Sequence, residues 1–74
     1  MTTWNHRVVK VNDEGGEWLM FSEVFYDEEG KPLGYHEPFM GSETMEGLAE
    51  TLTRLLNAMN EPVLDAKTDF KQTQ

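Results

Sequence analysis

The 74-residue chain contains no cysteine, and this absence removes several kinds of chemistry at once. It excludes a disulfide framework, a zinc site built on thiolates and a cysteine nucleophile. The chain also lacks an uninterrupted apolar segment of the roughly 20 residues that a membrane-spanning helix requires. Its N-terminal residues show no basic stretch followed by an apolar core. We therefore expect no signal peptide, no membrane association and a cytoplasmic location.

Basic residues are scarce in this sequence. Six lysines and arginines stand against fourteen aspartates and glutamates, which gives a formal net charge of −8 at neutral pH. Contacts with nucleic-acid phosphates need clustered basic side chains, so the composition argues against direct binding of nucleic acid. High charge with modest apolar content is also typical of disorder, but two Trp, two Tyr and four Phe residues gather mostly in the first 40 positions. We predict a single small α+β domain over residues 1–70 and a frayed tail at 71–74.

Three segments of the N-terminal half are expected to be strands. Segment 3–11 is rich in β-branched and aromatic residues, and the glycine pair that follows it supplies the positive φ angles of a hairpin turn. Segment 17–26 is largely apolar on both of its alternating faces, which is typical of a central strand covered on both sides. A turn at 27–32 leads to segment 33–39, where Pro38 favours a weaker edge strand.

A helix is expected from Met45 onward. Apolar residues recur there at spacings of three and four, which places them on one stripe of a helix with about 3.6 residues per turn. Thr44 or Ser42 can cap its start, and the residue before Pro62 ends it because that residue avoids the α region. The stripe consists of Met45, Leu48, Ala49, Leu52, Leu55, Leu56 and Met59.

The order of these segments predicts an α+β fold of the type β-β-β-α. A three-stranded antiparallel β-meander is followed by one amphipathic helix packed on one face of the sheet, and then by an extended C-terminal tail. One helix covers only one side of the sheet, whereas segment 17–26 is apolar on both sides. The other face is then covered by the tail or by a second protein, or it remains an apolar patch. We favour a homodimer over a monomer whose bare face binds a partner.

Four stretches of the chain stand in a characteristic order: a strand at 4–11, Glu-Val-Phe-Tyr-Asp-Glu-Glu-Gly at 23–30, Gly-Ser-Glu-Thr-Met-Glu-Gly-Leu at 41–48 and Pro-Val-Leu at 62–64. Together they resemble a set of small uncharacterised bacterial proteins over nearly the whole chain. The resemblance implies no established activity and so carries no functional residues. The chain departs from the pattern at Gly47, where a glutamate is more typical. This departure removes the reciprocal half of a capping box.

The β-β-β-α order and the start of the helix after the stretch 41–44 also resemble the HicB-type antitoxin domain, in topology alone. Proteins of that type often add a DNA-binding segment, and this sequence has no counterpart to it. Antitoxin activity would therefore be only an analogy.

Candidate catalytic and metal-binding groups are few. His6, His36 and Glu37 could share a metal ion only if the first and third strands were neighbours, and no third histidine or thiolate completes the set. The paired carboxylates fall in turns and on one helix face, whereas acid–base chemistry needs them in a pocket. The acidic turn at 27–30 lacks the alternating spacing and the distal glutamate of a calcium loop. We predict no catalytic residues, no cofactor and no metal site.

Aromatic residues point to binding instead. A domain this small cannot enclose all of them, and Trp and Tyr are typical anchors of protein interfaces. The sequence thus predicts a non-enzymatic module that binds another protein and associates with itself. The candidate interface residues are Trp4, Trp18, Met20, Phe21, Phe25, Tyr26 and Tyr35.

The acidity of the chain suggests an alternative function. A protein that mimics nucleic acid could inhibit a nucleic-acid-binding protein, as a phage anti-defence protein would. This hypothesis requires Glu43, Glu46, Glu50 and the turn 27–29 to form one continuous face. A net charge of about −2 to −8 is also ordinary for keeping a small domain soluble.

Overall fold

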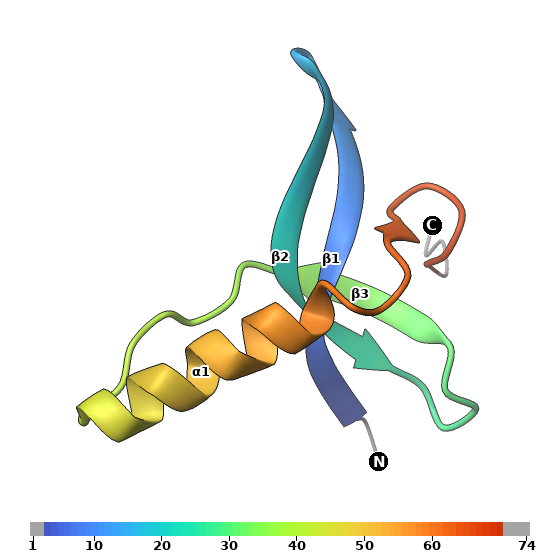
Figure 1. The fold of residues 1–74 in the computed structure, drawn as a ribbon. Helices are drawn as coiled ribbons and strands as arrows, with labels where there is room; N and C mark the ends of the chain where they lie inside the picture. The colour runs from blue at the N-terminus through green and yellow to red at the C-terminus, as the bar shows by residue number, and fades with distance from the viewer. Residues whose placement is uncertain (1–2, 71–74) are drawn as a thin grey trace.

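The computed structural model describes residues 3–70 and contains one sheet and one helix (Figure 1). The strands form a mixed four-stranded sheet in the order β3-β2-β1-β4. The predicted α+β class is confirmed, and the three-stranded meander is extended by a fourth strand that pairs parallel to β1. The predicted frayed tail at 71–74 lies outside the described residues. The elements are β1 (Thr3–Asp13), β2 (Gly16–Tyr26), β3 (Pro32–His36), α1 (Met45–Ala58) and β4 (Leu64–Asp65).

A long hairpin of β1 and β2 is the framework of the sheet. The two strands pair along their whole length, from Thr3 opposite Tyr26 to Asp13 opposite Gly16. Gly16 has a φ of 111°, which a residue with a side chain rarely adopts. Figure 1 shows the tip of this hairpin standing clear of the other elements. The edge strand β3 is shorter than predicted and stops before Pro38, which has no N–H group to donate to a ladder.

The two faces of the sheet are covered by different parts of the chain. Side chains alternate along a strand, so Val9 and Val24 share one face, which we call the tail face. Both are fully buried there, and Phe70 from the C-terminal segment packs over them. The ring of Phe70 lies 5.0 Å from the ring of Tyr35, measured between centroids. The sequence left open whether this face is covered by the tail, by a second protein or by nothing. In the structure the chain's own tail covers it.

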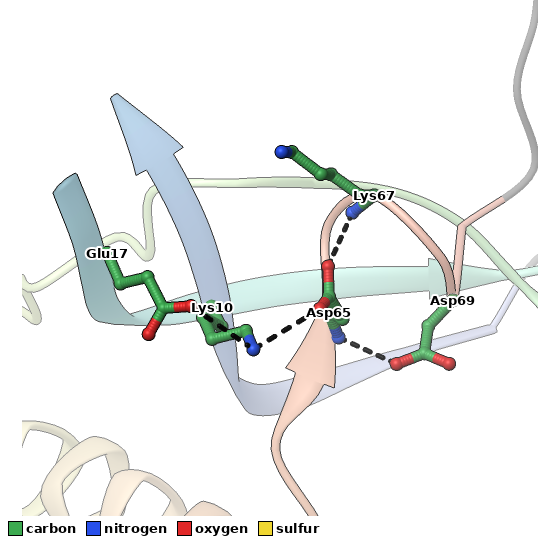
Figure 2. Close-up of polar contacts among 5 residues, drawn as sticks. All are labelled: Lys10, Glu17, Asp65, Lys67 and Asp69. Atoms are coloured by element: carbon green, nitrogen blue, oxygen red, sulfur yellow. Dashed lines mark hydrogen bonds and ion pairs between the residues drawn. The ribbon is translucent and has the colours of Figure 1, made fainter. Parts of the chain in front are cut away.

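Polar contacts fix the tail segment beside β1 (Figure 2). The Lys10 ammonium lies 3.4 Å from the Asp65 carboxylate and 3.7 Å from that of Glu17. The Asp65 carboxylate also accepts a hydrogen bond from the backbone N–H of Lys67 at 2.8 Å. That hydrogen bond and the neighbouring Lys10 hold the pKa of Asp65 below its usual value of 3.8. The contact with Asp65, and then the charge of Glu17, raise the pKa of Lys10 above 10.5.

The start of α1 is capped as the sequence suggests. Of the two candidates, Thr44 is the N-cap: its backbone is extended and its hydroxyl accepts a hydrogen bond from the N–H of Gly47 at 3.0 Å. The hydroxyl of Ser42 accepts from the N–H of Thr44 at 3.3 Å. A Cβ at position 47 would collide with that Ser42 hydroxyl. Gly47 therefore makes room for Ser42, in addition to lacking the glutamate of a capping box.

The helix packs on the sheet through less of its surface than predicted. Within α1, Leu55 and Ala58 are buried, and both belong to its C-terminal half. Figure 1 shows that end of α1 close to β1, while the first half of the helix runs away from the strands. The chain leaving α1 is held by Arg7, whose guanidinium donates a hydrogen bond to the carbonyl of Pro62 at 2.6 Å. The Cα radius of gyration, 13.2 Å, exceeds the value of about 11.3 Å typical of a compact chain of this length.

The tail contact gives a first prediction. Phe70→Ala should lower the free energy of unfolding in urea by about 3 kcal/mol, because it empties the space above Val9 and Val24. Phe39→Ala is the matched control, since 75% of Phe39 is exposed, and it should change stability by less than about 0.5 kcal/mol. Equal effects of the two substitutions would show that the tail does not cover the sheet.

The ion pair gives a prediction about pH. Because folding lowers the pKa of Asp65, its ionised form stabilises the fold above pH 3.8, and this contribution is lost as the pH falls through the lowered value. The raised pKa of Lys10 stabilises the fold below pH 10.5 and is lost above it. Asp65→Asn should therefore be less stable than the parent near neutral pH, and the difference should vanish in acid.

Urea unfolding of both proteins from pH 2 to pH 8 measures this difference. Glu28→Gln removes one negative charge from an exposed turn residue and serves as the control. A stability gap between parent and Asp65→Asn that stays constant into acid would contradict the role given to the ion pair.

Candidate functional site

The predicted interface residues fall on both faces of the sheet. Trp4, Trp18, Phe21 and Tyr35 are exposed, whereas Met20, Phe25 and Tyr26 are half-buried. The strand register separates them, because residues directly opposite each other share a face. Trp4, Phe21 and Phe25 lie on the face that meets α1, which we call the helix face, and the others lie on the tail face. The residues therefore do not make one continuous surface.

Both tyrosines have partners within the chain. The Tyr26 hydroxyl donates to the Asn5 side-chain carbonyl at 2.7 Å and accepts from Arg7 at 3.3 Å. Tyr35 packs against Phe70, as described above. These contacts give Tyr26 and Tyr35 a role in holding the fold together.

The histidines lie on the helix face, with Glu23 of β2 between them. His6 is opposite Glu23 across β1 and β2, and His36 is opposite Glu23 across β2 and β3. The His36 ring lies 3.6 Å from the Glu23 carboxylate. Strand β2 thus separates the two histidines, as the sequence predicts. Among residues 3–70, no three His, Asp or Glu side chains come together in a way that could hold a metal ion.

An open groove runs between the start of β1 and the end of α1. Its volume is about 560 Å³. Glu61 is the one carboxylate in its lining, whereas catalysis by paired carboxylates needs two in one pocket. His6 is buried at its floor, and the Nε2 atom has no hydrogen-bond partner in the described part of the chain. The groove is lined by Trp4, Asn5, His6, Arg54, Asn57, Ala58 and Glu61.

One side of α1 is apolar and exposed to solvent. Successive residues of an α-helix are turned by about 100°, so the helix can be divided into sides. One side of α1, which we call the sheet side, is formed by Leu55 and Ala58, which are buried, and by Gly47 and Thr51, which are half-buried. A second side, which we call the outer stripe, contains Met45, Leu48, Leu52, Leu56 and Met59. The centre of the outer stripe lies about 100° around the helix axis from the centre of the sheet side.

Every residue of the outer stripe is exposed. The exposed fraction runs from 39% for Leu48, the member nearest the sheet side, to 80% for Met45. The helix therefore buries Leu55 and Ala58 and leaves the large apolar residues of the outer stripe in solvent. The third side of α1 is polar and carries Glu46, Glu50, Arg54 and Asn57.

A second exposed apolar group lies on the strands. Trp18 and Leu19, near the tip of the hairpin, are each 61% exposed, and Trp4 and Phe21 are 49% and 38% exposed. We call these four residues the hairpin cluster. Trp18 lies on the tail face and the other three lie on the helix face. Trp4 lies opposite Phe25, at the end of the hairpin away from the tip, so the four residues are spread along the hairpin.

The acidic groups that would make a nucleic-acid mimic are far apart. Figure 1 shows the turn between β2 and β3 and the start of α1 at opposite ends of the molecule. The first holds Asp27–Glu29, and the second holds Glu43 and Glu46. Asp27 is also engaged locally, because its carboxylate accepts hydrogen bonds from the backbone N–H groups of Glu29 and Lys31, each at 2.9 Å.

Comparison with known proteins does not assign this chain to a family. A scan of protein-family models and searches of curated proteins and of solved structures found no match to this chain. The resemblance to small bacterial proteins and to the HicB-type domain stays a prediction. Within residues 3–70, no helix is both long enough and apolar enough to cross a bilayer.

Proposed function

We propose that this chain is a small non-enzymatic protein-interaction module that works in a self-associated form in the cytoplasm. The observation that supports it is the outer stripe of α1, whose five large apolar residues are 39–80% exposed. The largest apolar patch exposed by a typical monomeric protein is about 300–600 Å², and such a patch is often functional. From the exposed fractions, the outer stripe presents roughly 500 Å² of surface in each copy.

The energetics favour covering this surface. Burying it in two copies is worth roughly 25 kcal/mol before costs, at about 25 cal/mol per Å². The loss of translational and rotational freedom on association costs about 4–15 kcal/mol. The buried apolar residues within one copy are few: Val9, Val24, Leu55, Ala58 and Phe70. Association therefore supplies apolar burial that the single chain lacks.

The hairpin cluster supports binding of a further protein in the same proposal. Its four residues lie on strands, apart from the outer stripe, and two of them are tryptophans. Tryptophan is enriched among the residues that dominate binding energy at protein interfaces. A second partner could therefore bind at the hairpin while α1 is covered.

The acidic inhibitor ranks behind this proposal. It depends on one continuous acidic face, and the turn at 27–29 and the start of α1 lie at opposite ends of the molecule. The apolar surface, in contrast, needs no rearrangement of the chain to be available.

Light scattering coupled to gel filtration tests the proposal. The parent protein should show twice the 8.5 kDa mass of one chain. Leu48→Ser combined with Leu56→Ser should raise the dimer dissociation constant at least about 100-fold, because each substitution removes a partly exposed leucine from the covered surface. Glu50→Ser, on the polar side of α1, should leave the mass unchanged.

Circular dichroism of the same samples checks that α1 is retained in each variant. A parent protein that remains monomeric at its highest soluble concentration would contradict self-association. So would a double variant that associates as strongly as the parent.

A further inference from the structure

The order and spacing of residue types in the outer stripe are the same from either end. Its residues are Met, Leu, Leu, Leu and Met, at successive spacings of three, four, four and three. Leu52 is the centre, with leucines four residues away on each side and methionines seven residues away.

A stripe with this symmetry places like side chains opposite each other in a two-fold interface. In an interface between identical copies related by a two-fold axis, if residue i of one copy contacts residue j of the other, then j also contacts i. Two outer stripes laid antiparallel about an axis through Leu52 satisfy this rule. Met45 then lies opposite Met59 of the second copy, and Leu48 lies opposite Leu56 of the second copy. Leu52 lies opposite Leu52 of the second copy.

We propose that the outer stripe is covered by the outer stripe of a second copy, in an antiparallel helix pair centred on Leu52. This inference rests on the proposed self-association and specifies its geometry. The spacing of three and four residues is that of helices packed side by side with interlocking side chains.

The distribution of charge on α1 permits this pairing despite the net charge of −8 on each chain. Glu46 and Glu50 lie on the polar side, about 120° and 160° around the helix from the centre of the outer stripe. The residues that border the outer stripe on its solvent side are uncharged: Ala49, Thr53 and Asn60. Within α1 the pair therefore brings no carboxylates of the two copies into contact, and salt screens the repulsion between exposed charges.

The area also fits a second copy. Two outer stripes together bury roughly 1,000 Å². A specific protein interface needs about that area at least, and a standard one buries about 1,600 Å². Figure 1 shows the first half of α1 extending away from the strands.

Disulfide cross-linking tests the register, because the chain has no cysteine of its own. In an antiparallel pair centred on Leu52, Leu52→Cys is the single substitution in the stripe that can bond to its own counterpart, since a disulfide needs Cα atoms about 4.4–6.8 Å apart. We expect Leu52→Cys to form a covalent dimer on mild oxidation. Leu48→Cys and Leu56→Cys should each stay unlinked alone and should cross-link when mixed.

Glu50→Cys, on the polar side, is the control for random collisions and should not cross-link. The mixture of Leu48→Cys and Leu56→Cys leaves Leu52 intact, so it tests the same register if Leu52→Cys fails to fold. Self-linking of Leu48→Cys as fast as that of Leu52→Cys would overturn the antiparallel register. Efficient linking of Glu50→Cys would likewise overturn it.

The outcomes separate this inference from the proposed function. A parent protein that is dimeric by light scattering, with none of the expected cross-links, would overturn the helix pair and leave self-association standing. A monomeric parent without cross-links would overturn both the helix pair and self-association. This is the result expected if the outer stripe binds a different protein.

Discussion

The rotation of α1 about its own axis is the constraint on which the rest of this structure depends. Leu55 and Ala58, near the end of α1, are its buried residues, whereas its first half runs away from the strands. Two buried residues contribute little apolar area. The larger residues of the outer stripe are left in solvent as a consequence. A chain of this length has few other places to find apolar burial, which is the reason for the proposed self-association.

The opposite side of the sheet is closed by the chain itself. Phe70 covers Val9 and Val24, and the Lys10–Asp65 ion pair fixes the segment that carries Phe70. The tail thus covers the buried core of one face, whereas α1 covers the other face only in part. Among the described residues, the exposed apolar surface therefore includes the outer stripe of the helix and, apart from it, the hairpin cluster.

Much of the fold follows from local pattern, and the parts that do not are set by tertiary contact. The hairpin and α1 could be predicted because glycine positions and apolar periodicity act over neighbouring residues. Strand β4 has two residues, and its pairing of Leu64 with Val9 leaves no periodic signal. Periodicity also shows which residues share a side of a helix but not which side meets the sheet.

The central claim is that the outer stripe of α1 is buried against the outer stripe of a second copy. An isotope-filtered NMR experiment on a mixture of labelled and unlabelled protein tests it most directly. Leu48 and Leu56 lie about 12 Å apart along one helix, too far for a direct signal within one copy. The account predicts nuclear Overhauser contacts between Leu48 methyl groups of one copy and Leu56 methyl groups of the other. Well-dispersed spectra of a folded dimer without these contacts would contradict it.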